Sequence, residues 1–133
     1  MAKGVPLRQR LTDEMREVAL HVESNVNAPS VSRSHLAPLR PSLGPRYDDV
    51  VLVVSELVTN SVRHSRSVGI DVTVRSVDGR IRVEVSDDGP GFTVDTPRGE
   101  GLGLMLVDKL SDRWGLTSAD QFTVWAELGR DPV

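Results

Sequence analysis

The sequence contains no cysteine among its 133 residues. This absence excludes disulfide bonds, cysteine-based zinc sites and thiol catalysis, and it is typical of a reducing compartment, so we expect a cytoplasmic protein. Aromatic residues are also scarce, at 4% of the chain. We expect Trp114 and Trp125 to be packing residues.

The sequence also lacks a strong charge and a long hydrophobic run. The formal net charge is −3, which provides no basic surface for nucleic acid and is explained by solubility alone. No apolar run reaches the ~20 residues needed to cross a bilayer. Residues 1–6 carry no apolar core of a signal peptide behind their charge. We therefore expect no direct contact with nucleic acid or with a membrane.

The length fits one domain of ordinary size. We divide the chain into an N-terminal extension, residues 1–17, and a single domain, residues 18–133. Residues 1–10 are polar and basic and are expected to fray. Acidic residues favour a short helix over 11–17, and alternating apolar residues predict a strand over 18–23.

Helical patterns dominate the next part of the chain. Ser30 is a good N-cap for a helix over about 31–40, which Pro38 should kink or end. Residues 41–45 predict a loop. A long apolar helix follows over about 46–65, with acidic residues at its start and basic residues at its end, as the helix dipole favours.

A β-hairpin is predicted after this helix. Apolar and polar residues alternate over 69–77 and over 80–87, and Asp78-Gly79 between them is a strong two-residue turn signal. Strand side chains alternate between faces, so Asp87 points to the side of the inward valines. A carboxylate in the interior is costly unless it has a partner.

Glycine-rich segments interrupt the pattern after the hairpin. Residues 88–92 end the second strand, and 93–100 form a polar loop. The remaining predicted elements are a helix from the glycine-rich run 99–104 to about residue 112, with Leu106, Val107 and Leu110 as its core stripe, and closing strands over 114–117 and 122–128. These elements predict an α+β two-layer sandwich with a mixed, mainly antiparallel sheet and helices on one face.

The long helix carries unexpected polar residues. Its run Val50–Ser65 is too apolar for a surface helix, yet it contains Glu56 and Asn60. Positions three or four apart share a helical face, so these side chains form a polar strip with Arg63. Because such a carboxylate needs partners, we interpret the strip as the lining of a binding site.

Three features together indicate a magnesium–nucleotide site: the helical acid and amide, the inward Asp87, and a glycine-rich segment before a helix. Glycine lets a ligand approach the backbone, and a helix N-terminus presents N–H groups to phosphate. An amide oxygen suits Mg²⁺, and a carboxylate could act as a base. Each feature alone has a simpler explanation, namely a turn, glycine packing or a satisfied hydrogen-bond pair. The glycine pattern is neither a Walker nor a Rossmann motif.

The three features stand in the order of a known set of motifs. Glu56-x-x-x-Asn60, Asp87-x-Gly89-x-Gly91 and Gly99-x-Gly101-x-Gly103-Leu104 resemble the N, G1 and G2 boxes of the Bergerat-fold ATPases, which join gyrase, heat-shock chaperones, histidine kinases and mismatch-repair proteins. Within this superfamily, Ser55–His64 and Val85–Gly91 are similar to the small anti-sigma factor serine/threonine kinases of the actinobacterial regulatory type. The resemblance covers roughly residues 18–128.

The resemblance implies roles for individual residues. Asn60 would coordinate Mg²⁺ on the ATP phosphates, Glu56 would be the general base towards a serine hydroxyl, and Asp87 would bond the adenine amino group. The other implied ATP-binding residues are Gly89 and Gly91 in the adenine pocket, Gly99, Gly101, Leu102, Gly103 and Leu104 in the lid, and, from position alone, Arg63 and Arg98 at the phosphates.

The resemblance also implies a function. The chain would be a cytoplasmic, ATP-binding anti-sigma regulatory factor that phosphorylates a serine of an anti-sigma-factor antagonist and controls transcription by partner switching. Its partners would be a sigma factor and the antagonist, and it would form a homodimer. The alternative is an ATP-binding module that sequesters a partner without catalysis. A histidine-kinase catalytic domain and a packing domain without nucleotide are less favoured.

Two departures from the family pattern bear on this interpretation. The predicted lid, about 92–98, is short, which fits the small kinases better than the chaperones. Residues 120–123, Asp-Gln-Phe-Thr, stand where family members often carry a Gly-Lys-Thr-like turn, so the sequence offers no basic group at that place.

Overall fold

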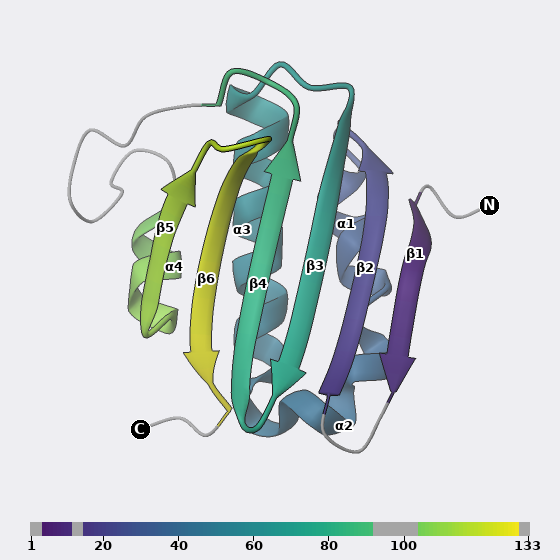
Figure 1. Ribbon diagram of the computed structural model, residues 1–133, viewed down its shortest axis with the longest axis vertical. Coiled ribbons are helices and arrows are strands. Elements are labelled where there is room, and N and C mark those ends of the chain that lie inside the picture. Colours follow the sequence, from purple (N-terminus) through teal and green to yellow (C-terminus); the bar gives the residue numbers. More distant parts are fainter. Residues whose placement is uncertain (1–3, 12–14, 92–103, 131–133) are drawn as a thin grey trace.

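The computed structural model describes residues 4–11, 15–91 and 104–130. One layer of the molecule is a six-stranded sheet with the order β1-β2-β3-β4-β6-β5 (Figure 1). All pairs of neighbouring strands in the described residues are antiparallel. The strands are β1 (Gly4–Leu11), β2 (Met15–Glu23), β3 (Gly69–Val77), β4 (Arg80–Asp87), β5 (Arg113–Thr117) and β6 (Phe122–Gly129).

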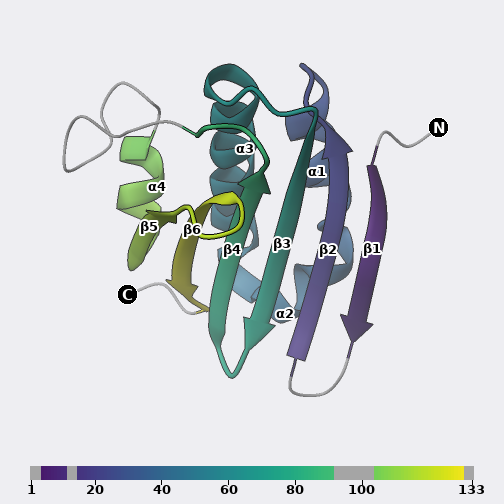
Figure 2. The same cartoon turned by 45° about the horizontal axis from the view of Figure 1, so that its top comes forward.

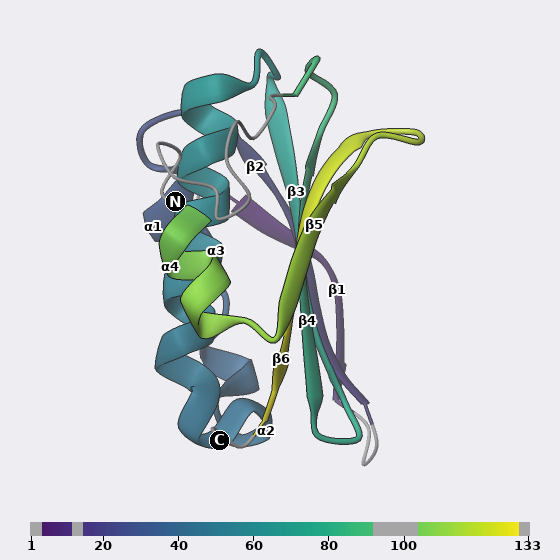
Figure 3. The ribbon, with the colours of Figure 1, turned by 90° about the vertical axis from the view of Figure 1, so that its left-hand side faces the viewer.

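Helices form the second layer and cover one face of this sheet (Figure 3). They are α1 (Ala28–Ser34), α2 (Arg40–Leu43), α3 (Tyr47–His64) and α4 (Leu104–Leu110), with single 3₁₀ turns η1 (Ala37–Leu39) and η2 (Gly44–Arg46) before and after α2. The predicted α+β sandwich with helices on one face is confirmed. No helix in the described ranges is long and apolar enough to cross a membrane.

The core lies between α3 and the helix-facing side of the sheet. Alternate residues of β4 and β6 are buried, as the period of a strand requires. They pack in one cluster with the apolar face of α3, which supplies Val50, Val53, Val54, Leu57 and Val58. This burial fixes α3 against the sheet, because each apolar side chain removed from water contributes about 1.5–3 kcal/mol.

The long helix, the hairpin and the closing strands match their predicted positions within one or two residues. The β3–β4 hairpin has its turn at Asp78 and Gly79, both with positive φ. Asp87 is the last residue of β4 and has the predicted inward parity. Trp114 is partly buried against the core, whereas Trp125 lies on the outer face of the sheet beneath Arg82.

The N-terminal prediction was wrong. Residues 4–11 form the edge strand β1, although we expected fraying, and β2 begins at Met15, within the helix expected over 11–17. The pairing of β2 with β3 runs without interruption from Met15↔Val77 to Glu23↔Gly69. The hydrogen bonds of so long a strand pairing outweigh a weak local preference for helix. The domain boundary at residue 18 remains a prediction, and residues 1–3 and 12–14 lie outside the described residues.

The segment between β2 and α3 also differs from its prediction. In place of one helix over 31–40 and a loop over 41–45, four short helical segments follow one another from Ala28 to Arg46. Each of them has a proline in its first two positions. Proline is favoured there because its missing N–H would have no helical partner and its φ is already helical. Here the prolines begin helical turns, and Asn27, not Ser30, is the N-cap of α1.

Candidate functional site

The candidate site lies at the end of the molecule where both α3 and β4 end. Figure 2 turns this end towards the viewer. Asp87 closes β4 with a side chain that is only 2% exposed. Its position follows from strand parity, which directs it to the helix-facing side of the sheet.

The Asp87 carboxylate is held by hydroxyl groups of α3 and the residue after it. Ser61 Oγ donates to Asp87 Oδ2 at 2.5 Å, and Ser65 Oγ donates to Asp87 Oδ1 at 2.5 Å. The backbone N–H of Gly89 donates to Oδ1 at 2.9 Å. An ionised carboxylate offers about four acceptor positions, so this arrangement leaves capacity for about one further donor.

Ser61 and Ser65 were missed as site residues in the sequence. Both are buried, and their spacing of four residues places them on one face, one turn apart. That spacing, together with an inward Asp87 that needed donors, was the available signal. The sequence does not show that the end of β4 meets the end of α3, because this depends on how the helix packs on the sheet.

Asn60 and Glu56 lie one helical turn apart on α3. Asn60 is 3% exposed, and its side-chain nitrogen has no hydrogen-bond partner in the described part of the chain. A buried polar atom without a partner costs about 1–3 kcal/mol, so a ligand or a neighbouring group is needed to satisfy it. Glu56 is half-buried and is therefore reachable from solvent.

The glycines after β4 stand where any side chain would clash with its neighbours. A Cβ at Gly89 would lie 2.3 Å from Ser65 Oγ and 2.9 Å from the backbone nitrogen of Arg66. A Cβ at Gly91 would lie 2.4 Å from the ring of Phe122. Phe122 is the pairing partner of Asp87 across the β4–β6 ladder. The glycines therefore allow the chain to pass closely over the side chains around Asp87.

The other predicted site residues have different positions. Arg63 is exposed in the last turn of α3, and Leu104 is the fully buried first residue of α4. The structure thus brings Asn60, Asp87, Gly89 and Gly91 to one end of the fold. The predictions for Arg98, Gly99, Gly101, Leu102 and Gly103 lie outside the described residues.

Comparison with protein families identifies this arrangement. The family described as "Histidine kinase-, DNA gyrase B-, and HSP90-like ATPase" matches residues 46–130, more than half of the chain. The chain belongs to this ATPase family. The matched residues begin just before α3 and include all three glycine- and acid-containing motifs, so the chain is an ATP-binding domain of the gyrase, histidine kinase and HSP90 type.

The individual members of the ATPase family that resemble this chain have low sequence identity to it. The serine-protein kinases RsbW of Staphylococcus aureus strains JH9 and Newman are each 26% identical over 136 residues, covering 84% of this chain and 80% of theirs. The crystal structure of the RsbU and RsbW domains of a Mycobacterium tuberculosis protein has the same fold, with a TM-score of 0.58 at 20% identity. That match covers 84% of this chain and 32% of the mycobacterial chain.

Proposed function

We propose that this ATPase-family domain is an ATP-dependent protein serine/threonine kinase that acts as an anti-sigma regulatory factor. It would phosphorylate a serine of an anti-sigma-factor antagonist and control transcription by partner switching. The observation that carries the proposal is the buried Asp87, held by Ser61, Ser65 and Gly89, together with a buried Asn60 whose side-chain nitrogen has no hydrogen-bond partner among the described residues. The distant similarity to RsbW serine-protein kinases supports the choice of kinase within the family.

Asp87 fits the recognition of a neutral donor such as the adenine amino group. The carboxylate is fixed by two hydroxyl groups and one N–H, and it has capacity for one further hydrogen bond. Gly89 and Gly91 let the backbone pass close to the Ser65 and Phe122 side chains. These residues would hold and orient the adenine ring.

Asn60 fits a metal bound mainly by phosphate and water. No group of three or more acidic or histidine side chains suited to a metal ion occurs in residues 4–11, 15–91 and 104–130. Mg²⁺ keeps several waters and takes one or two protein ligands together with substrate phosphates, so a single amide oxygen would be enough. When bound, the ion would neutralise charge on the phosphates. Arg63, Arg98 and the glycines of 99–104 remain proposed phosphate contacts.

Glu56 would accept the proton of the incoming serine hydroxyl. It lies one turn before Asn60 on the same face of α3, and its partial exposure would let a protein substrate reach it. The sigma factor, the antagonist, the homodimer and the cytoplasmic location are part of the same proposal.

The test measures phosphoryl transfer and ATP binding in parallel. The purified chain is incubated with labelled ATP–Mg²⁺ and an antagonist co-purified from the native host. We expect Glu56→Gln to lower the transfer rate by about 10²–10⁴, while its ATP affinity stays within about twofold of the unmodified chain. Glu23→Gln is the matched control, because Glu23 is exposed at the end of β2 and should change neither quantity.

Two outcomes would contradict the proposal. Unchanged transfer in Glu56→Gln would remove Glu56 as the base. Tight ATP binding by the unmodified chain without any label on the antagonist would favour the module that sequesters a partner without catalysis.

A further inference from the structure

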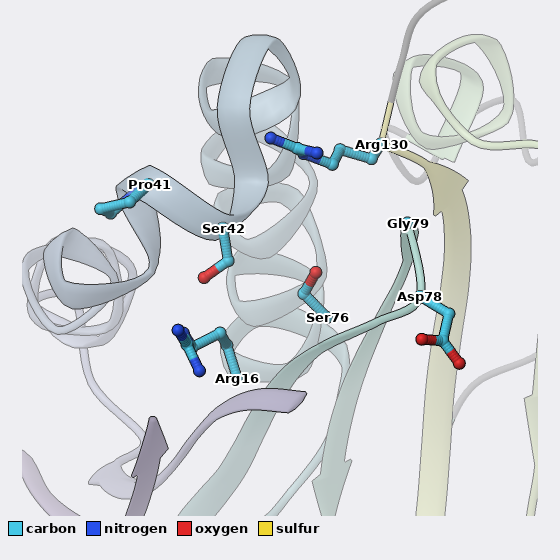
Figure 4. Close-up of a pocket in the computed structure, with 7 residues that line it drawn as sticks. All are labelled: Arg16, Pro41, Ser42, Ser76, Asp78, Gly79 and Arg130. Atoms are coloured by element: carbon cyan, nitrogen blue, oxygen red, sulfur yellow. The ribbon is translucent and has the colours of Figure 1, made fainter. Parts of the chain in front are cut away.

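A pocket lies at the opposite end of the molecule from Asp87. It has a volume of about 350 Å³, which lies in the range of small-molecule pockets. This open pocket is bordered by the start of β2, by α2, by the β3–β4 turn and by the residue after β6 (Figure 4). Its lining residues are Arg16, Pro41, Ser42, Ser76, Asp78, Gly79 and Arg130.

The charged residues that line this pocket are mostly basic. They are Arg16 and Arg130, whereas Asp78 is the acidic residue among the lining residues. Figure 4 shows the Asp78 carboxylate directed away from the serine hydroxyls and from the Arg16 guanidinium. An anion in the pocket would therefore meet donors on several sides.

Arg130 is held in place at this pocket by the hairpin turn and by η2. Its backbone N–H donates to Gly79 O at 2.7 Å. Its Nε lies 3.3 Å from where a Cβ of Gly44 would stand, and Gly44 has a φ of +55°. The guanidinium thus fills the space that a glycine leaves open at the start of η2.

The two serines supply hydroxyl donors from different layers. Ser76 is 7% exposed and comes from β3, whereas Ser42 comes from α2. Ser42 Oγ is shielded from solvent and has no hydrogen-bond partner in the described part of the chain. A buried hydroxyl without a partner is costly, and rotation of the Ser42 side chain towards the pocket would bring it to a bound oxyanion.

We propose that this pocket binds a small phosphate-bearing anion. Arginine matches phosphate oxygens through paired N–H donors, and hydroxyl groups add further hydrogen bonds. The donors come from three elements and from the residue after β6, and they approach from different directions. This arrangement suits the tetrahedral oxygens of a phosphate better than a planar carboxylate. The pocket shares no residue with the candidate ATP site, so the two sites are separate.

The test uses inorganic phosphate as the probe. The ¹⁵N-labelled full chain is titrated with phosphate at constant ionic strength, and the amide signals of Ser42, Gly79 and Gly89 are followed by NMR. We expect saturable shifts at Ser42 and Gly79. Arg130→Gln should weaken the affinity measured at these amides about tenfold or more, because it removes a charge-assisted hydrogen bond.

A second variant separates binding from folding. Ser42→Ala removes a hydroxyl that has no partner in the described residues, so it should weaken phosphate binding severalfold without lowering the unfolding temperature. Arg75→Gln is the matched control. Arg75 precedes Ser76 on β3, so its exposed side chain points to the other face of the sheet, and the phosphate affinity should stay within twofold.

Three results would overturn the proposal. They are shifts at Ser42 and Gly79 that do not saturate, a phosphate affinity that is unchanged in both Arg130→Gln and Ser42→Ala, and tighter binding of succinate than of phosphate. Shifts confined to Gly89 would place phosphate in the candidate ATP site and would equally refute a separate pocket. None of these results bears on kinase activity, which is tested through Glu56.

Discussion

At the scale of single residues, the site depends on how Asp87 is satisfied. Its described partners are two hydroxyl groups and an N–H, and none is a cation. A hydroxyl can rotate about its C–O bond and can also accept a hydrogen bond. Asp87 therefore keeps acceptor capacity for a donor on the ligand while these hydrogen bonds fix its position.

Gly91 and Gly79 form a matched pair for testing close packing beside this site. Both have a φ of +77°, but a Cβ at Gly79 would meet nothing within 4 Å, whereas one at Gly91 would meet the Phe122 ring. We expect Gly79→Ala to lower the free energy of unfolding by about 1–2 kcal/mol from backbone strain alone. Gly91→Ala should lower the free energy of unfolding by about 1–3 kcal/mol more than Gly79→Ala does, because of overpacking.

Urea denaturation of both variants measures the difference between them. The double variant Gly91→Ala with Phe122→Leu should recover part of the additional loss, because leucine lacks the ring that the Cβ meets. Equal losses in Gly79→Ala and Gly91→Ala would show that the contact with Phe122 does not constrain residue 91.

Much of the site could be predicted at this scale, but its internal contacts could not. Strand parity was enough to place Asp87 in the interior, and helical spacing was enough to group Glu56 with Asn60. The donors to Asp87 depend on the packing of α3 against β4, which no local pattern specifies. Arg63 shared the spacing of the polar strip, yet it lies on the exposed side of the last turn.

At the scale of elements, one glutamate joins three strands on the outer face of the sheet. Glu127 of β6 accepts hydrogen bonds from Arg113 of β5, whose Nε lies 2.8 Å from Glu127 Oε1. It also accepts one from Arg82 of β4, whose Nη1 lies 2.8 Å from Glu127 Oε2. The Arg113 and Arg82 guanidinium groups lower the pKa of the Glu127 carboxyl from its usual 4.5. Arg82 also lies over the Trp125 ring, 4.7 Å from its centre.

This network predicts a dependence of stability on pH. Because the pKa of Glu127 is lower in the folded chain, its contribution is fully present above about pH 4.5 and is lost as the pH falls through the folded pKa. Glu127→Gln should therefore be less stable than the unmodified chain at pH 7, and the difference should shrink towards pH 3. Urea denaturation at several pH values measures this difference in the free energy of unfolding.

Glu23→Gln serves as the control for this comparison, since Glu23 is exposed. Its difference from the unmodified chain should be small at every pH. A Glu127→Gln difference that stays constant from pH 7 to pH 3 would contradict the assigned role of the two arginines.

The prediction of elements succeeded where patterns were long and failed where proline was read only as a breaker. The hairpin of 69–87 has strict alternation and a two-residue turn, and both strands were predicted to the residue. Between Ala28 and Arg46 the prolines stand at the starts of helical turns. Whether a proline ends a helix or begins one depends on whether a backbone N–H is needed at its position, which is a property of the folded chain.

At the scale of the whole molecule, nucleotide binding should raise stability. A ligand that binds only the folded state stabilises it by RT ln(1 + [L]/Kd), about 2.7 kcal/mol at one hundred times Kd. We expect ATP–Mg²⁺ to raise the unfolding temperature of the unmodified chain. Asp87→Asn should lose most of this shift, because an amide cannot accept hydrogen bonds on both sides as the carboxylate does.

Asp120→Asn is the matched control in the thermal-shift measurement. Asp120 is exposed in the turn between β5 and β6, so the shift with ATP–Mg²⁺ should match that of the unmodified chain. An undiminished shift in Asp87→Asn would remove this residue from nucleotide recognition. The absence of any shift in the unmodified chain would contradict nucleotide binding by the family domain at the concentrations tested.

Helix α3 spans the distance between the two proposed sites. It follows η2, which comes directly after α2, and α2 borders the proposed phosphate pocket. The last turn of α3 carries a hydroxyl that holds Asp87. With 18 residues it is about 27 Å long. If both sites bind as proposed, thermodynamic linkage relates them: any factor by which phosphate changes the affinity for ATP must equal the factor by which ATP changes the affinity for phosphate.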